Sequence, residues 1–242
     1  MASVQEAIAE LDEVRAAEVR VELDTRLAAL ATGESNWGNL VADGVLRAAR
    51  SNASLYDSTS PVAALVDAGS LAGDTPIAEG EVSRLALLER IRQGQVVGVL
   101  QTVDPQVLKS MLEAAFADLG GEGIRSGLRS RDHLRSGRDR TGAGCGRLRV
   151  RRRHPGGRGR GSTDGDTLIR DGAPVADARS ISLAVSERLR RELPLGDAEP
   201  INVGTTLLRA LDSQVRSSLQ GVIRSDDYPV EGEGRIRVVD GG

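Results

Sequence analysis

The sequence predicts a mainly α-helical fold with minor β structure (α+β), in which amphipathic helices form two parts separated by an irregular Arg/Gly-rich segment. Three observations predict it. Several segments place apolar residues at helical spacing, and residues typical of helix starts precede many of them. Alternation of apolar and polar residues, which indicates a half-buried strand, is confined to short stretches. We expect a helical N-terminal part (1–120), the irregular segment (121–165) and an α+β C-terminal part (166–242).

The first thirty residues predict one long helix that ends before Gly33. Ser3 and Glu6 form a capping box at its start. Its apolar positions recur at helical spacing, at Val4, Ile8, Leu11, Val14, Val19, Leu23, Leu27 and Leu30. Because this apolar stripe is narrow, we expect the helix to pack on a partner helix or another subunit.

Four further helices are expected in the N-terminal part, over residues 37–50, 61–68, 79–93 and 105–119. Ser60-Pro61 and Asp104-Pro105 are typical helix starts, because proline suits the first helical position. The β-branched run in 95–102 predicts a strand, and residues 69–78 are expected to form a loop.

The C-terminal part predicts a mixture of strands and helices. Extended segments are expected at 167–170 and 174–176, around an Asp171-Gly172 turn, and an edge strand at 234–240. Helices are expected over 182–193 and over 206–222, the second capped by Thr205 or Thr206. The helices over 105–119 and 206–222 carry the most continuous apolar stripes. We expect them to bury Leu108, Met111, Leu112, Phe116, Leu208, Leu211, Val215 and Leu219.

Charge is distributed unevenly along the chain. Residues 125–160 hold 13 arginines and only two acidic residues, whereas the remainder has 33 acidic against 19 basic residues and a net charge of −14. Lys109 is the single lysine of the chain. A surface rich in carboxylates with few lysines is typical of proteins from salt-loving archaea, and a GC-rich actinobacterial source is the alternative.

The Arg/Gly-rich tract 125–160 has two interpretations. As written, it resembles a disordered arm whose arginines neutralise nucleic-acid phosphates, although it contains no aromatic residue for base stacking. Alternatively, the tract is the translation of its coding DNA in a shifted reading frame. Arginine codons of the form CGN, read one base later, yield triplets for Val, Ala, Asp, Glu or Gly, which match the composition of the rest of the chain. The abrupt changes of composition near Gly123 and Gly161 favour this second interpretation.

Motifs for catalysis or metal binding are not apparent. Cys145 is the single cysteine, and the two histidines, His133 and His154, both fall in the Arg/Gly-rich tract without a cysteine pair. Gly-Lys-Ser/Thr does not occur, so the tract's glycines do not form a phosphate-binding loop of that type. We therefore expect no catalytic residue, no metal ligand and no cofactor.

These observations favour a non-enzymatic structural or assembly subunit of a larger complex, with a connector or tail component of a haloarchaeal tailed virus as the specific form. We expect it to associate with other protein subunits as a homo- or hetero-oligomer. The alternative is a nucleic-acid-binding protein that uses Arg147, Arg149, Arg151, Arg152, Arg153, Arg158 and Arg160. The sequence has no long apolar run and no secretory leader pattern. We expect a cytoplasmic or virion location, without membrane contact.

Re-sequencing the coding DNA tests the shifted frame. We expect a base to be gained or lost near each end of the tract 125–160, because the composition changes at both ends. An uninterrupted frame through the arginine codons would contradict this interpretation.

Overall fold

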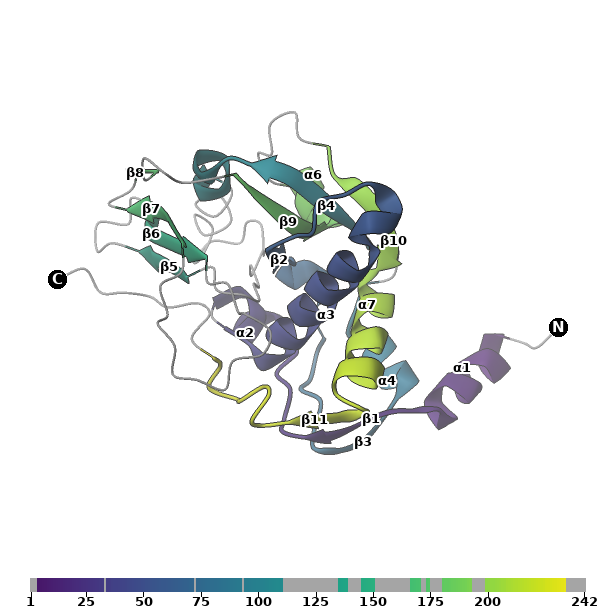
Figure 1. Ribbon diagram of the computed structural model, residues 1–242. Coiled ribbons are helices and arrows are strands. Elements are labelled where there is room, and N and C mark those ends of the chain that lie inside the picture. The colour runs from purple at the N-terminus through teal and green to yellow at the C-terminus, as the bar shows by residue number, and fades with distance from the viewer. Residues whose placement is uncertain are drawn as a thin grey trace.

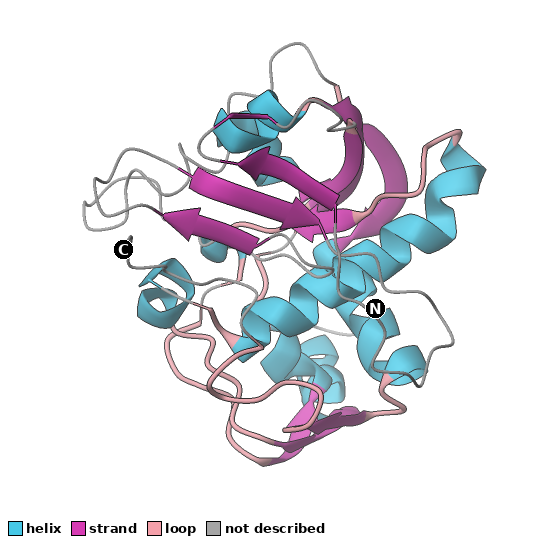
Figure 2. Cartoon of the chain, turned by 60° about the vertical axis from the view of Figure 1, so that its left-hand side comes forward, coloured by secondary structure: helices cyan, strands magenta, loops and turns pink. Residues whose placement is uncertain are grey.

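A computed structural model gives the fold of the chain, shown as a ribbon in Figure 1 and by secondary structure in Figure 2. The structure describes residues 4–32, 34–71, 73–92, 94–110, 135–138, 145–150, 166–170, 173–174, 180–192 and 199–233. Within these residues the fold is α+β: helices lie between two mixed sheets, and a third, antiparallel sheet lies to one side (Figure 1).

The two mixed sheets combine parallel and antiparallel pairs. The upper sheet of Figure 1 has four strands in the order β10 (Ile201–Thr206), β4 (Val96–Val103), β9 (Ile181–Ser186) and β2 (Ala63–Leu65). The lower sheet has three strands in the order β11 (Val222–Arg224), β1 (Arg15–Arg20) and β3 (Gly80–Ser83). β2 pairs with β9 in parallel, and β1 pairs with β11 in parallel. Each of the two mixed sheets therefore combines strands that precede residues 121–165 with strands that follow them.

The third sheet is antiparallel, in the order β5 (Arg135–Arg138), β6 (Cys145–Val150), β7 (Asp166–Arg170) and β8 (Ala173–Pro174). Its first two strands fall in the Arg/Gly-rich tract, so these stretches are strands rather than irregular backbone. Pairing with β7 satisfies the backbone groups that an irregular chain would leave to solvent. The other residues of the tract lie outside the described residues.

The helices α3 (Asn36–Asn52) and α7 (Leu207–Ser213) lie between the two mixed sheets, whereas α1 (Val4–Glu13) projects to one side of the lower sheet (Figures 1 and 2). The other helices are α2 (Leu27–Thr32), α4 (Arg84–Leu88) and α6 (Glu187–Glu192), and residues 105–110 are helical as well. Two 3₁₀ turns, η1 (Ala53–Tyr56) and η2 (Ala68–Ser70), and a π turn, η3 (Gln214–Ser218), complete them. None of the helices in the described part is long and apolar enough to cross a membrane.

The long helix α3 is the centre of the core. Ser35 caps its N-terminus by accepting a hydrogen bond from the Gly38 amide. Trp37 is fully buried in the first turn, and its indole Nε1 donates to the Leu71 carbonyl at 3.0 Å. At Gly44 the helix meets α7 closely, because a Cβ atom there would lie 2.8 Å from the Ala210 carbonyl oxygen. The helix expected over 37–50 is confirmed.

The prediction of a mainly α-helical fold is wrong, and the N-terminal region shows why. α1 ends at Glu13, and residues 15–20 form β1 instead of continuing the helix expected to Leu30. Ala17 and Val19 are buried and alternate with more exposed neighbours, which is the pattern of a strand. Apolar residues that recur every two residues also recur every four residues, which is close to the period of a helix. The same positions therefore agreed with a helix as well as with a strand. Backbone pairing with β3 and β11 stabilises the extended conformation of these residues over a helix.

The predictions of helices over 61–68 and 182–193 are also wrong, because these segments contain the strands β2 and β9. α6 follows β9, and only Glu187–Glu192 of the second segment is helical. The helix expected over 79–93 is replaced by β3 followed by the short helix α4. Every residue of β2 is buried, and all but one of β9. A strand buried on both faces is a continuous apolar run, which spacing alone does not separate from a buried helix.

Several other expectations are confirmed. The strand expected over 95–102 is β4, the segments around Asp171-Gly172 are β7 and β8, and Thr206 caps α7. Leu108, Leu211 and Val215 are buried, whereas Leu208 and Leu219 are only partly buried. Met111, Leu112, Phe116 and the strand expected over 234–240 lie outside the described residues.

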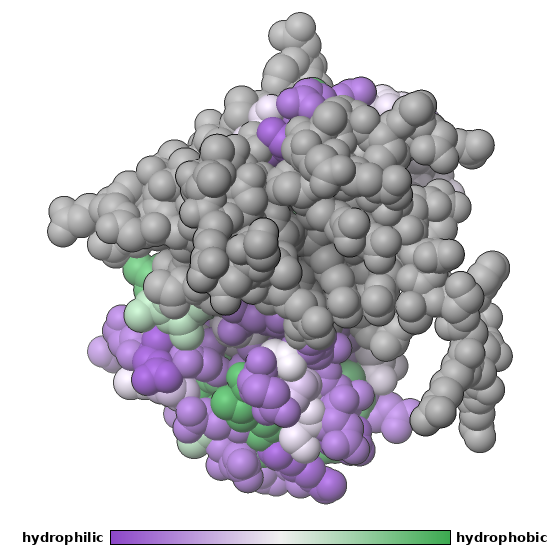
Figure 3. Space-filling view, turned by 90° about the vertical axis from the view of Figure 1, so that its left-hand side faces the viewer, coloured by the Kyte–Doolittle hydropathy of each residue, from purple (hydrophilic) through white to green (hydrophobic). Residues whose placement is uncertain are grey.

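The outer surface of the described part is largely polar. Figure 3 shows one face, on which hydrophilic residues surround a small hydrophobic area. On the lower sheet, Glu18 pairs with Arg15 at 3.3 Å and with Arg20 at 2.7 Å. Such exposed pairs contribute little to stability, so the core around α3 is the main source of it.

Leu211→Ala tests the contribution of α7 to this core. Leu211 is fully buried, so we expect the substitution to lower the free energy of unfolding by roughly 2–5 kcal/mol. Thermal unfolding in molar salt measures the change. Leu55→Ala is the control, since Leu55 is 75% exposed and its truncation should leave the melting temperature nearly unchanged. Equal melting of both variants and the parent would contradict the packing described for α7.

Candidate ligand-binding site

A cluster of polar side chains lies where two parallel strands of the upper sheet end. β2 runs into the turn η2, and its neighbour β9 runs into α6. Because the strands are parallel, their carboxyl ends meet at the same edge of the sheet. Ligands bind preferentially beyond this edge in sheets with parallel strands. The cluster contains Asp67, Ser70, Ser186 and Arg188, with Gly69 beside them.

The Asp67 carboxylate is the centre of this cluster and is only 1% exposed. Its Oδ1 accepts a hydrogen bond from the Ser70 amide at 2.8 Å. Its Oδ2 accepts from the Ser70 hydroxyl at 2.7 Å and from the Ser186 hydroxyl at 3.0 Å. A single buried carboxylate therefore ties the turn after β2 to the last residue of β9.

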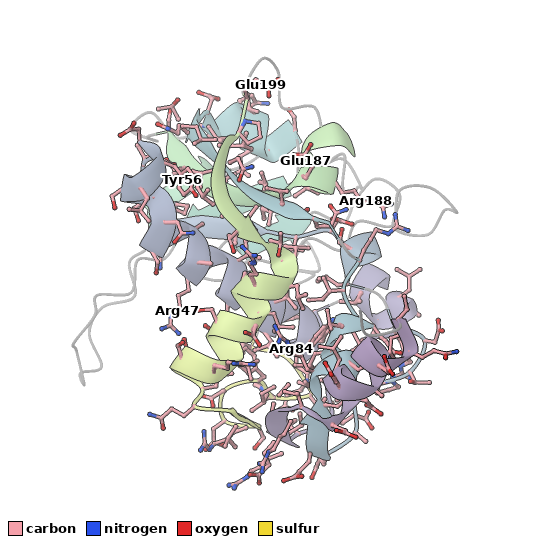
Figure 4. All side chains as sticks on the ribbon, turned by 90° about the vertical axis from the view of Figure 1, so that its right-hand side faces the viewer. Arg47, Tyr56, Arg84, Glu187, Arg188 and Glu199 are labelled. Atoms are coloured by element: carbon pink, nitrogen blue, oxygen red, sulfur yellow. The ribbon has the colours of Figure 1, made fainter. Side chains whose placement is uncertain are left out.

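Arg188 provides the positive charge of the cluster. Its Nε lies 3.6 Å from Asp67 Oδ1, and its side chain is 29% exposed. The guanidinium lies against Gly69, where an added Cβ atom would come within 2.6 Å of NH1. The Arg188 amide donates to Gln95 Oε1 at 3.2 Å, which fixes the backbone of the first turn of α6. Figure 4 shows Arg188 and Glu187 at the upper sheet, well separated from Tyr56.

This arrangement is suited to binding an oxyanion. A guanidinium is positively charged at all physiological pH values, and its planar set of N–H donors matches the oxygens of a phosphate, sulfate or carboxylate. Asp67 orients the group from the buried side, while the accessible part of the side chain reaches solvent. Charge-assisted hydrogen bonds of this kind are stronger than neutral ones.

Two acids of the described residues have a pKa that a neighbouring arginine lowers. A hydrogen bond from Arg26 lowers the pKa of Asp24, and one from Arg20 lowers the pKa of Glu18. Both acids belong to the region of the lower sheet and the turn that follows β1. They have no part in the candidate site.

The arginines named from the sequence as nucleic-acid contacts fall in or next to strand β6 and in the residues that follow it. Arg147 and Arg149 belong to β6, but their side chains are not among those described. Arg151, Arg152, Arg153, Arg158 and Arg160 lie outside the described residues altogether. In the part of the chain that is described, no three His, Cys, Asp or Glu residues form a group that could hold a metal ion.

The residues of the cluster were missed by sequence reasoning. Asp67 follows the apolar run of β2, and Ser186 ends that of β9. A polar residue directly after a buried strand is a signal for a site at the sheet edge. This signal is hidden here because the spacing of both runs also predicts helices.

Asp67→Ala tests the role of this carboxylate. The substitution removes the carboxylate beside Arg188 and the acceptor of two hydroxyl groups, so we expect a loss of roughly 2–4 kcal/mol in the free energy of unfolding. Chemical denaturation measures it. The control is Asp74→Ala, an exposed acid of the following loop, for which we expect almost no change. A similarly small effect at Asp67 would show that the cluster does not hold the two strand ends.

The fold is shared with solved structures of several enzymes. No protein-family model and no curated protein matches the chain. A 5'-nucleotidase precursor from Thermus thermophilus superposes with a TM-score of 0.73 at 18% identity, over 96% of this chain and 41% of that protein. The Haemophilus influenzae NAD nucleotidase gives 0.62 at 9% identity, over 97% and 39% of the two chains. A sulfate thiohydrolase from Thermus thermophilus gives 0.58 at 18% identity, over 96% and 36%.

These likenesses correct the functional expectations. The expectation of a non-enzymatic structural or assembly subunit is wrong, and so is that of a virion connector or tail component. The solved structures named above that share the fold are nucleotidases and a thiohydrolase. The nucleic-acid-binding alternative is not supported by them either. The chain spans about two fifths of the length of these proteins. Its fold is shared with part of each of these enzymes.

Proposed function

We propose that this chain is the ligand-binding part of a phosphoesterase of the 5'-nucleotidase type, and that Arg188 binds the anionic group of the ligand. One observation carries the proposal. In a fold shared with nucleotidases, a guanidinium held by a buried carboxylate lies at the carboxyl ends of β2 and β9. A binding site at this edge fits the general placement of ligands in such sheets.

The chemistry of the named ligands supports this assignment. A 5'-nucleotide and NAD both carry phosphate groups, and sulfate is an oxyanion of the same tetrahedral shape. A guanidinium meets such a group with two parallel hydrogen bonds. Because the chain spans about two fifths of the similar enzymes, complete hydrolysis is proposed only for an assembly that also holds the remaining part.

Calorimetric titration of the whole chain tests the proposal, with adenosine 5'-monophosphate, adenosine, inorganic phosphate and sulfate as probes. We expect the monophosphate to bind and adenosine to bind much more weakly, since the phosphate group makes the contact with Arg188. Arg188→Ala should weaken binding of the monophosphate roughly tenfold or more.

Arg209→Ala is the matched control, because Arg209 is an exposed arginine on α7 and is not one of the residues of the cluster. Its removal should leave the affinity unchanged. Two results would contradict the proposal: adenosine binding as tightly as the monophosphate, or Arg188→Ala binding as tightly as the parent.

A further inference from the structure

The glycine two residues after Asp67 has an unusual neighbour. A Cβ atom built on Gly69 would lie 2.6 Å from NH1, 2.9 Å from Cζ and 3.2 Å from NH2 of Arg188. These three atoms are the head of the guanidinium, so its flat group lies directly on the glycine. Real Cβ atoms essentially never approach other atoms within 3.0 Å. Any side chain at this position would therefore displace the Arg188 head.

We propose that Gly69 is a positioning residue of the ligand site: it leaves the space in which the Arg188 guanidinium is held to meet an oxyanion. This inference rests on the proposed function, because it assigns to Arg188 the contact with the ligand. Gly69 itself does not touch the ligand and acts through Arg188.

Contacts with Asp67 and Gly69 hold the guanidinium, and a contact with Gln95 fixes the backbone of Arg188. The Gln95 side chain holds the Arg188 amide at 3.2 Å, and Asp67 lies 3.6 Å from Nε. Gly69 lies beneath NH1 and NH2. Binding groups lose effectiveness when they are displaced by about an ångström. A methyl group at Gly69 pushes NH1 and Cζ of Arg188 out of their place and leaves the backbone contact to Gln95 unchanged.

A second glycine of the same loop shows what makes Gly69 distinctive. A Cβ atom on Gly73 would overlap Cδ of Arg90 and lie 2.8 Å from the hydroxyl of Thr25, which is fully buried. There the methyl group meets the stem of a side chain and a core residue, neither of which can move away easily. At Gly69 it meets only the far end of a flexible side chain, so Gly69→Ala leaves the core undisturbed.

Gly69→Ala, titrated with adenosine 5'-monophosphate beside the parent chain, tests the proposal. We expect the affinity to fall roughly tenfold or more, because the added methyl group displaces the N–H donors of the Arg188 guanidinium. The melting temperature stays within about 2 °C of the parent, as for a substitution outside the core. An unchanged affinity overturns the positioning role while leaving the proposed function intact. A parent chain that binds neither the monophosphate nor inorganic phosphate overturns the proposed function, and this inference with it.

Two further variants separate positioning from a general effect on the loop. In the Arg188→Ala background, Gly69→Ala causes no additional loss of affinity, because the residue through which it acts is gone. Gly73→Ala lowers the melting temperature and leaves the affinity unchanged. An additional loss in the Arg188→Ala background, or an equal loss of affinity in Gly73→Ala, overturns the proposal.

Discussion

The parallel pairing of β2 with β9 brings together two segments that are far apart in the chain, and the upper sheet and the candidate site both depend on it. Ser186 and Asp67 are 119 positions apart, yet their side chains are joined by a hydrogen bond of 3.0 Å. The register Ala64↔Ala184 and Leu65↔Val185 sets this closeness, because it ends both strands at the same edge. A shift of register by one residue would turn the side chains of β2 to the opposite face and remove Asp67 from the cluster.

How much of this was predictable depends on how locally each element is specified. α3 carries an apolar stripe of helical period, and Thr206 has the chemistry of a cap, so both were recognised from the sequence. β2 and β9 are buried almost throughout, and runs of three and six residues are too short for their spacing to separate strand from helix. The pairing partner decides their conformation, and the partner is not visible in a local window.

The site was harder to predict for the same reason. Asp67 and Arg188 are ordinary charged residues in the sequence, without a motif around them. Burial is what distinguishes Asp67 from other carboxylates of the chain. A carboxylate that is 1% exposed must be paired and hydrogen-bonded, whereas the same group on the surface needs no partner. The Arg/Gly-rich tract attracted attention because its composition is extreme. Composition shows how a segment differs from the rest of the chain and does not show which residues meet.

The residues of the candidate site and those of the Arg/Gly-rich tract come from different parts of the chain. Asp67, Gly69, Ser70, Gln95, Ser186 and Arg188 all lie outside residues 125–160, and so do all the strands of the two mixed sheets. The tract contributes β5 and β6 to the third sheet, which pairs with neither of the others. If the tract is read out of frame, its true residues would change β5 and β6 of that third sheet. The contacts of Arg188 with Asp67, Gly69 and Gln95 would remain, because these three residues lie outside the tract.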